Sequence, residues 1–253
     1  MDLERLALDL RGAAARGEIV AVYQPEQDLT TGRIVAVESL SRWNHPTLGP
    51  IAPTTFIPLA EQSQLIHEVG DFMLEDGCRN AAEWQRGGYG IEVAINVAAR
   101  QLATATFYER LQHLVSALSL NPYGITIEVT ESQVIADHVQ VAGRLGHLRE
   151  LGLGVSIDDF GTGYSSVEQV LTLPANELKI DRSLVQNGDP TKPLLAAVVE
   201  LAHERGLRVV AEGIETEEHL RLARDIHCDR VQGFLIGRPT TRQGIDRLIA
   251  ESA

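Results

Sequence analysis

Short apolar runs alternate along the chain with segments of helical periodicity. Eight runs have the alternation and the valine and isoleucine content of strands, and they cover residues 19–23, 34–41, 91–96, 125–129, 154–158, 177–180, 208–211 and 230–234. Between the later runs, apolar residues recur every three or four positions, which predicts helices over residues 140–151 and 193–205. This rhythm predicts a parallel β/α architecture, and eight strands favour a closed barrel over an open sheet.

The first two strands depart from this rhythm. The segment between them, "PEQDLTTG", is rich in turn residues and too short for a crossover helix, which predicts an antiparallel hairpin. The expected fold class is therefore α/β, a modified TIM (β/α)8 barrel with an antiparallel first strand. We expect a single domain over residues 1–253. Residues 1–17 are expected to contain a short amphipathic helix, either within the domain or at the end of a linker from a longer protein.

Charge and cysteine content narrow the class of protein. A formal net charge of −13 argues against binding of DNA or RNA polymers and against docking on anionic membranes. It leaves a small phosphate-bearing ligand open, because bound metal ions reverse the local field. Only Cys78 and Cys228 are present, and they form no CxxC pair. Two cysteines far apart in the sequence indicate a reducing environment, so we expect a cytoplasmic location. No apolar run is long enough to span a bilayer, so we expect no membrane insertion, and a larger membrane-anchored parent protein is left open.

Polar residues lie at or near the C-terminal ends of nearly all the predicted strands. These residues are Glu38, Asn96, Glu128, Asp158, Asp159, Lys179, Asp181, Glu212 and Gln232. Each one alone is consistent with a solvated loop residue. In a parallel barrel, however, the C-terminal ends of the strands converge on one face, where active sites are built. The recurrence on so many strands therefore predicts a functional site on that face.

The residue types at these ends indicate metal binding. Carboxylates gathered on one face repel one another, and divalent cations relieve that repulsion. All-oxygen ligands suit Mg²⁺ or Mn²⁺, whereas the eight histidines show no zinc-ligand spacing. Asp158 and Asp159 can serve two ions if the backbone turns sharply, and Gly161 and Gly163 are free to adopt positive φ. Two such ions would activate water for an in-line displacement at phosphorus.

Nine segments of the sequence resemble those of a known family. The matching segments are "YQPEQDLTTG", "ESLSRW", "FIPLAEQSQLI", "INVAARQL", "EVTES", "IDDFGTGYSS", "LKIDRS", "VVAEGIET" and "VQGFLIGRP". Together, and in this order, they resemble the EAL domains, which are bacterial phosphodiesterases that linearise the second messenger cyclic di-GMP to pGpG. The resemblance runs from about residue 3 to about residue 250.

The resemblance implies a role for each matching residue. It implies metal ligands at Glu38, Asn96, Glu128, Asp158 and Asp159, with Asp158 shared between two ions and Asp159 serving the second. Lys179 would hold the attacking water or a phosphate oxygen, Glu212 would be the essential glutamate and a candidate general base, and Gln232 would orient water. The implied substrate-binding residues are Gln24, Leu40, Arg42 and Asp181. Glu131 and Ser132 would couple the metal site to a dimer interface, and Glu215 would brace that region.

The family resemblance also implies cofactors and partners. Two Mg²⁺ or Mn²⁺ ions, cyclic di-GMP and a second copy of the chain are expected. Calcium is expected to bind the oxygen ligands and inhibit, because its coordination geometry is loose. Sensory or diguanylate cyclase modules often precede such domains, so further domains upstream are an open expectation.

Four residues depart from the family pattern. Ser39 stands where alanine is usual, Ser41 replaces a usual leucine, and Glu26 and Gln27 lie where apolar residues are common. Because no residue of the catalytic pattern is missing, we expect an active enzyme. A non-hydrolysing cyclic di-GMP receptor is the alternative from another class. A barrel glycosidase is a third, although it leaves Asn96 and Lys179 unexplained.

Overall fold

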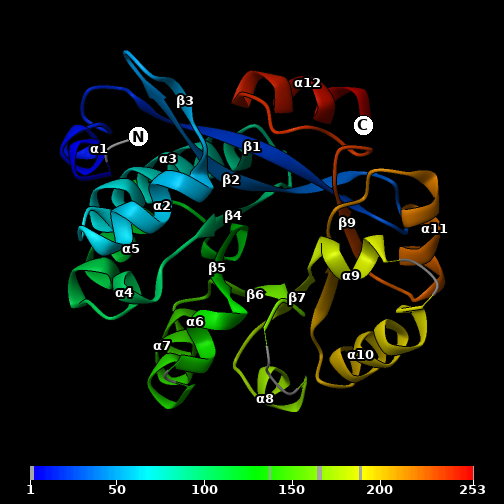
Figure 1. The fold of residues 1–253 in the computed structure, drawn as a ribbon. Coiled ribbons are helices and arrows are strands. Elements are labelled where there is room, and N and C mark those ends of the chain that lie inside the picture. The colour runs from blue at the N-terminus through cyan, green and yellow to red at the C-terminus, as the bar shows by residue number, and fades with distance from the viewer. Residues whose placement is uncertain (1–2, 137, 164–166, 188–189, 253) are drawn as a thin grey trace.

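The strands form one sheet that closes into a barrel (Figure 1). The computed structural model describes residues 3–136, 138–163, 167–187 and 190–252. The strands are β1 (Ile19–Asp28), β2 (Ile34–His45), β3 (Gly49–Ile51), β4 (Glu92–Asn96), β5 (Ile125–Thr130), β6 (Gly154–Phe160), β7 (Glu177–Ile180), β8 (Arg208–Ala211) and β9 (Arg230–Gln232). Residues 1–2 of the expected N-terminal segment and 164–166 of the "IDDFGTGYSS" motif lie outside the described residues.

Helices surround the barrel on its outside (Figure 1). They are α1 (Leu3–Leu10), α2 (Pro53–Gln62), α3 (Ile66–Arg86), α4 (Ala99–Leu102), α5 (Ala105–Ala117), α6 (Glu131–Ala136), α7 (His138–Glu150), α8 (Val167–Leu171), α9 (Arg182–Gln186), α10 (Lys192–Glu204), α11 (Glu217–Asp225) and α12 (Arg242–Ser252), with a 3₁₀ turn η1 (Pro122–Gly124) before β5. The first helix ends at Leu10, short of residue 17, and the chain then turns through Gly12 at a φ of 70°. None of the described helices is long and apolar enough to cross a membrane.

The antiparallel first strand closes the barrel. β1 pairs antiparallel with β2 on one side and with β9 on the other, while the neighbouring pairs from β2–β4 to β8–β9 are parallel. Only a short turn separates β1 from β2, and a connection of this length joins antiparallel strands. The predicted modified (β/α)8 barrel with an antiparallel first strand is confirmed.

Several strand predictions need correction. β1 runs to Asp28 and β2 to His45, beyond the expected ends at residues 23 and 41, so "PEQD" of the predicted turn segment lies in β1. A short strand, β3, pairs antiparallel with the end of β2 and was not among the expected strands. The last strand stops at Gln232 and does not reach Phe234. At the next position, a Cβ on Gly233 would lie 2.2 Å from the carbonyl oxygen of Ile214, and Leu235 N donates to that same oxygen at 3.0 Å. The chain therefore leaves the barrel wall to pack against the loop that follows β8.

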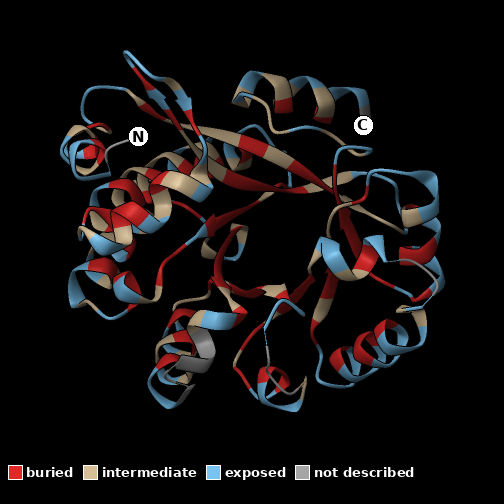
Figure 2. Ribbon diagram, viewed as in Figure 1, coloured by how far each residue is buried: buried red, intermediate tan, exposed pale blue. Residues whose placement is uncertain are grey.

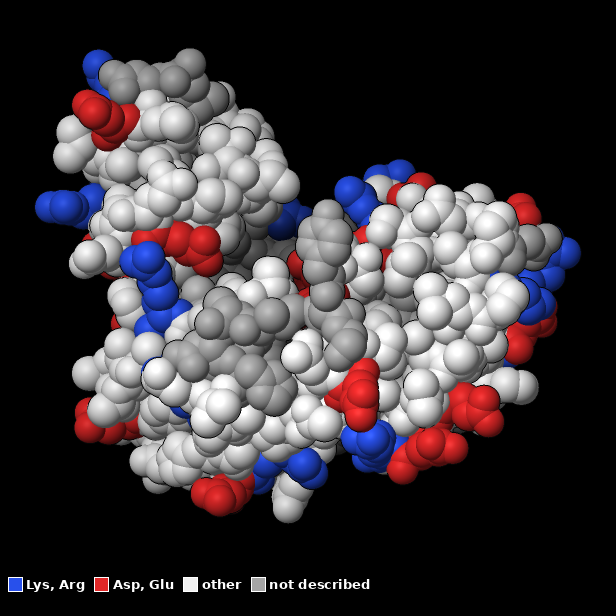
Figure 3. Space-filling model, turned by 60° about the horizontal axis from the view of Figure 1, so that its bottom comes forward, with Lys and Arg blue, Asp and Glu red and all other residues white. Residues whose placement is uncertain are grey.

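Alternation along the parallel strands separates the core from the site. In β5, Ile125, Ile127 and Val129 pack into the apolar core under the helices, so the alternate residue Glu128 faces the barrel interior. Nearly every residue of this strand is buried, as expected for a strand covered on both faces. Figure 2 shows the same pattern for the whole barrel, with buried strands and exposed outer helix faces. A space-filling view shows a deep hollow between two lobes of one face (Figure 3).

Candidate active site

Lys179 lies at the centre of the polar residues that the strands bring together. Its side chain on β7 is fully buried, and its Nζ forms close ion pairs with four carboxylates. The distances are 2.7 Å to Glu212 Oε1, 3.0 Å to Glu128 Oε1, 3.5 Å to Glu38 Oε2 and 3.7 Å to Asp158 Oδ1. These partners come from β2, β5, β6 and the end of β8, so the single ammonium group forms ion pairs with residues of four other strands.

A bulge in β6 positions the two consecutive aspartates. Ile157 pairs with Leu178 and Phe160 pairs with Ile180, so Asp158 and Asp159 together oppose the single residue Lys179. Asp159 has a φ of 56°, which is a left-handed conformation that aspartate tolerates better than most residues. In a regular strand the two side chains would point to opposite faces. The bulge brings both carboxylates to the same site.

The predicted turn after the aspartates therefore begins earlier than expected. Asp159 itself turns the chain, and Gly161 continues the turn with a φ of 101°. Gly163 does not adopt a positive φ. Its lack of a side chain has another use, because a Cβ there would lie 2.6 Å from Glu131 Oε1.

Glu38 accepts hydrogen bonds from two neighbouring amides. Asn96 Nδ2 donates to its Oε1 at 2.7 Å, and Gln232 Nε2 donates to its Oε2 at 2.8 Å. Burial disfavours the charged form of Glu38, but Lys179 and these amides outweigh it and hold the pKa below its usual value. Glu38 is thus held as a carboxylate in the wall of the barrel.

The other carboxylates hold protons more readily. Burial raises the pKa of Glu128 and of Glu212 well above the usual glutamate value, against the opposing effect of Lys179. Burial also raises the pKa of Asp158, and burial with the charges of Asp158 and Asp181 raises that of Asp159 to about 6. The site therefore has more negative charge than one ammonium group compensates.

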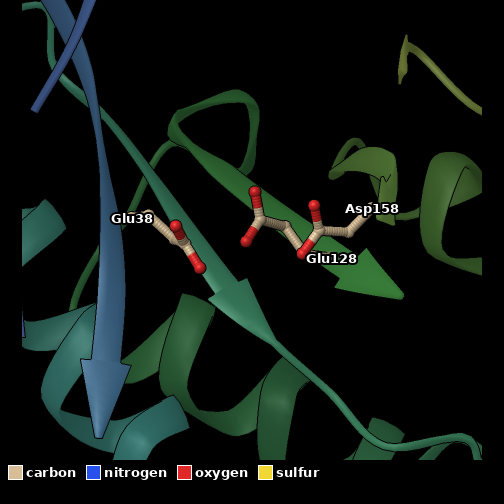
Figure 4. A group of neighbouring side chains, drawn as sticks. All are labelled: Glu38, Glu128 and Asp158. Atoms are coloured by element: carbon tan, nitrogen blue, oxygen red, sulfur yellow. The ribbon is translucent and has the colours of Figure 1, made fainter. Parts of the chain in front are cut away.

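Two overlapping groups of carboxylates have the spacing of metal sites. Oxygen atoms of Glu38, Glu128 and Asp158 lie within 4.8 Å of one another, and so do oxygen atoms of Asp158, Asp159 and Glu212. Figure 4 shows the first group, with the carboxylates turned toward one another from β2, β5 and β6. Both oxygens of buried Glu128 accept no hydrogen bond from the described residues. This hard, oxygen-only donor set fits divalent cations such as Mg²⁺ or Mn²⁺.

The charge of the cluster matches two such ions. Five carboxylates face one ammonium group, which leaves four net negative charges when every group is ionised. Two divalent cations neutralise this charge. Asp158 is the only residue common to both groups, as a shared ligand would be.

The segment after β5 supports the aspartate loop. Glu131, at the start of α6, is buried and accepts a hydrogen bond at its Oε2 from Gly161 N at 2.8 Å. Ser132 is exposed, and its Oγ lies 3.2 Å from Thr130 Oγ1. Glu131 therefore contacts the loop beyond the two aspartates directly, whereas the hydrogen bond of Ser132 is to the end of its own strand.

Two hollows flank Glu38. One, of about 280 Å³, is lined mainly by apolar side chains of α2 and α3 and reaches Asn96 and Glu128. The other, of about 270 Å³, is lined by Gln24, Arg182, Glu212, Glu215 and Phe234 among others. Glu38, Leu40 and Arg42 line both.

The expected substrate-binding residues differ in how they are held. Arg42 is half-buried, and its Nη1 donates to Ser41 O at 2.8 Å. Gln24 Nε2 donates to Gly237 O at 3.3 Å, which holds it beside the second hollow. Asp181 caps α9 by accepting a hydrogen bond from Ser183 N at 2.8 Å, so its carboxylate already has a structural partner.

Arg182 and Phe234 line the second hollow and were not predicted from the sequence. Arg182 opens α9 beside Gly213, where a Cβ would lie 2.2 Å from Arg182 Cβ. Phe234 is exposed and stacks beneath the Arg238 guanidinium, 4.2 Å from its ring centroid. The strand predicted over residues 230–234 contains Phe234, which gives no reason to expect this residue at the site. Because β9 ends at Gln232, Phe234 is exposed beside the hollow instead.

Comparison with known proteins agrees with this geometry. The family model described as the EAL domain matches residues 7–239. The chain belongs to the EAL domain family. A relative named bifunctional diguanylate cyclase/cyclic di-GMP phosphodiesterase MucR, from Pseudomonas aeruginosa, is 39% identical over 239 residues, which are 93% of this chain and 35% of MucR. Cyclic di-GMP phosphodiesterase NbdA of the same organism is 35% identical over 245 residues, covering 95% of this chain and 31% of NbdA.

The fold agrees with that of a solved EAL domain. The structure of the P. aeruginosa MucR phosphodiesterase in complex with c-di-GMP superimposes with a TM-score of 0.89 at 38% identity. The match covers 95% of this chain and 99% of that structure. This EAL domain spans about a third of the length of the two curated relatives. The activities in their names describe those longer proteins.

Proposed function

We propose that this EAL domain is a metal-dependent phosphodiesterase that hydrolyses cyclic di-GMP to linear pGpG. The observation that carries the proposal is the pair of carboxylate groups that share Asp158, at the C-terminal end of the barrel strands. Relatives named as cyclic di-GMP phosphodiesterases and a solved complex with c-di-GMP support the choice of substrate.

Glu38, Asn96, Glu128 and Asp158 would hold one ion, and Asp158, Asp159 and Glu212 would surround the other. When bound, the two ions polarise a phosphoryl oxygen and lower the pKa of water. Gln232 and Asn96 keep Glu38 charged through their amide groups. Lys179 Nζ offers a fixed positive charge for the attacking water or for a phosphate oxygen. Glu212 is the proposed base that takes a proton from the attacking water as the water oxygen bonds to phosphorus. One P–O ester bond breaks, and the leaving ribose oxygen takes up a proton to become the hydroxyl group of linear pGpG.

The shape beside the carboxylates supports a ligand with two bulky ends. A cyclic dinucleotide carries two bases and two phosphates, and the two hollows lie on either side of Glu38. Arg42 lines both, and Arg182 lines the second. Their guanidinium groups can donate hydrogen bonds to phosphate oxygens. Their positive charge favours a phosphate at this place although the chain as a whole is acidic.

The proposal is tested by incubating the protein with cyclic di-GMP and either Mg²⁺ or Mn²⁺ and separating the nucleotides by chromatography. We expect linear pGpG to accumulate with either ion and none to form after chelation. Tight binding without any linear product would support the alternative, a non-hydrolysing receptor. Product formed without a divalent ion would contradict the metal assignment.

Calcium is expected to inhibit this reaction. The carboxylate oxygens accept Ca²⁺, but its longer and more variable ligand distances hold the reacting groups poorly. Titrating Ca²⁺ into an assay with fixed Mg²⁺ should lower the rate progressively, and excess Mg²⁺ should restore it. Undiminished turnover with Ca²⁺ as the only divalent ion would contradict this expectation.

Glu212→Gln is expected to lower kcat by about 10²- to 10⁴-fold, the range for loss of a general base, with a smaller effect on substrate binding. The glutamine keeps the shape of the side chain but accepts no proton at neutral pH. Steady-state kinetics with a separate binding measurement distinguishes the two effects. Loss of binding with unchanged kcat would contradict the role of Glu212 as the base.

The setting of the domain belongs to the same proposal. We propose that it acts as one barrel domain in the cytoplasm, as a homodimer, and within a longer protein that carries sensory or diguanylate cyclase modules. The length of the relatives and the name diguanylate cyclase in one of them support the last point. The contact from Glu131 to the aspartate loop supports a route from a dimer interface to the metal site.

A further inference from the structure

A second cluster of charged side chains lies at the opposite end of the barrel interior. Four of its five members are the first residues of their strands, and the fifth lies on β1: Glu92, Glu177, Arg208, Arg230 and Glu26. We call this group the floor cluster. The proposed metal ligands lie at the C-terminal ends of the strands, so the floor cluster is separate from them.

Most members of the floor cluster are paired at short distances. Arg230 Nη2 donates to Glu92 Oε1 at 2.6 Å, and Arg208 Nη2 donates to Glu92 Oε2 at 2.9 Å. Arg208 Nε also donates to Glu177 Oε2 at 2.7 Å. These are charge-assisted hydrogen bonds, and they account for both guanidinium groups and for two of the three carboxylates.

Glu26 is the exception. Its side chain is 1% exposed, and neither carboxyl oxygen accepts a hydrogen bond from the residues that the structure describes. The nearest cation, Arg230 Nη1, lies 3.7 Å from Glu26 Oε2 and is committed to Glu92. A buried carboxylate in this position is poorly solvated and poorly paired, whereas a protonated carboxyl group is tolerated.

The charged groups around Glu26 divide between both signs. They are Glu38 on β2, Glu92 on β4, Glu128 on β5, Glu177 and Lys179 on β7, Arg208 on β8 and Arg230 on β9. Burial and the charge of Glu177 raise the pKa of Glu26 to about 7, against the opposing charges of Lys179 and Arg230. Charges of both signs act on Glu26, and desolvation is the largest single cause of the raised pKa.

We propose that Glu26 is a proton-binding residue inside the barrel that couples pH to the charge of the metal site, an inference that rests on the metal site proposed above. Glu26 pairs in register with Gln232, and its neighbours Arg230 and Glu177 each lie two positions before a site residue on the same strand. The charge of Glu26 disfavours the ionised form of Glu128 and favours the charged form of Lys179. Loss of the proton adds a negative charge behind the carboxylates and strengthens their attraction for a divalent cation.

The first measurement follows stability against pH. In the unfolded chain the pKa of Glu26 lies near the ordinary glutamate value of 4.5, so ionisation disfavours the folded state as pH rises from there to about 7. Between pH 4.5 and pH 8.5 the ratio of the unfolding constants of the parent and of Glu26→Gln should rise by about 150-fold and approach a constant value above about pH 8. Urea denaturation of both proteins between pH 4.5 and pH 8.5 gives this ratio.

The second measurement follows the metal site directly. Calorimetric titration of Mn²⁺ without nucleotide should show an affinity ratio, parent over Glu26→Gln, that increases severalfold between pH 6 and pH 8. Glu204→Gln removes one charge from the exposed end of α10 and is the matched control, for which the ratio should not change with pH. A second variant, Glu26→Leu, should behave as Glu26→Gln does and serves if the glutamine variant folds poorly.

Either of two results would overturn the proposal. One is a pH-independent ratio of unfolding constants, which would mean that Glu26 does not bind a proton near neutral pH. The other is a pH-independent ratio of Mn²⁺ affinities, which would mean that its charge does not reach the site. Neither measurement uses cyclic di-GMP, so these failures are distinguishable from a failure of the proposed phosphodiesterase activity.

Discussion

Asp158→Asn is expected to reduce hydrolysis of cyclic di-GMP by about 10³-fold or more, at the upper end of what losing one preorganised electrostatic group costs. Asp158 is the only residue shared by both carboxylate groups. Asparagine keeps the size of the side chain but loses its charge and one of its two acceptor oxygens. Both proposed ions therefore lose a ligand with a single substitution. Steady-state kinetics with Mg²⁺ and with Mn²⁺ measures the loss.

Asp159→Asn is the matched control, because it lies in the same bulge and belongs to only one of the two groups. Asparagine also tolerates the left-handed conformation of residue 159. We expect it to lose less activity than Asp158→Asn, and we expect both variants to keep the circular dichroism and thermal transition of a folded barrel. Full activity in a folded Asp158→Asn variant would remove the shared-ligand model.

The barrel could be predicted from the sequence because it depends on two local features, the length of the connections between strands and the alternation of side chains along each strand. The connection between β1 and β2 is too short for a crossover, so the antiparallel pair followed from chain length alone. Alternation then placed one set of side chains inside the ring, and this brought Glu38, Glu128, Asp158 and Lys179 to one place, as expected. Their roles in the reaction remain proposals.

The features that the sequence did not predict depend on contacts between distant segments. The bulge in β6 arises from the pairing of β6 with β7 and leaves no mark in the alternation of either strand. The end of β9 depends on how closely Gly233 approaches the loop after β8. The sequence showed Glu26 only as a charged residue where apolar residues are common. Its charged surroundings include Glu177 and Arg230, which lie far along the chain and come close only in the folded barrel.

Lys179→Met is expected to give the largest change in stability. Lys179 has no exposed surface and lies within 3.7 Å of four carboxylates. Methionine fills a similar volume but leaves those carboxylates buried without their cation. Breaking a buried ion pair from one side costs about 3–5 kcal/mol. Urea denaturation of metal-free protein should therefore show a large loss of unfolding free energy, greater at pH 8 than at pH 6, because protons relieve the repulsion at lower pH.

Lys192→Met is the control, since Lys192 pairs with Asp225 at 2.6 Å on the exposed surface and its loss should change stability little. The metal assignment adds a second test of the same variant. If the two carboxylate groups hold divalent cations, Mg²⁺ replaces part of the charge that Lys179 supplied, and it should stabilise Lys179→Met more than the parent. Equal stabilisation of both proteins would contradict a metal site around Lys179. A small loss of stability in the metal-free variant would instead show that the carboxylates are protonated in the folded state and that the ammonium group is not what holds them together.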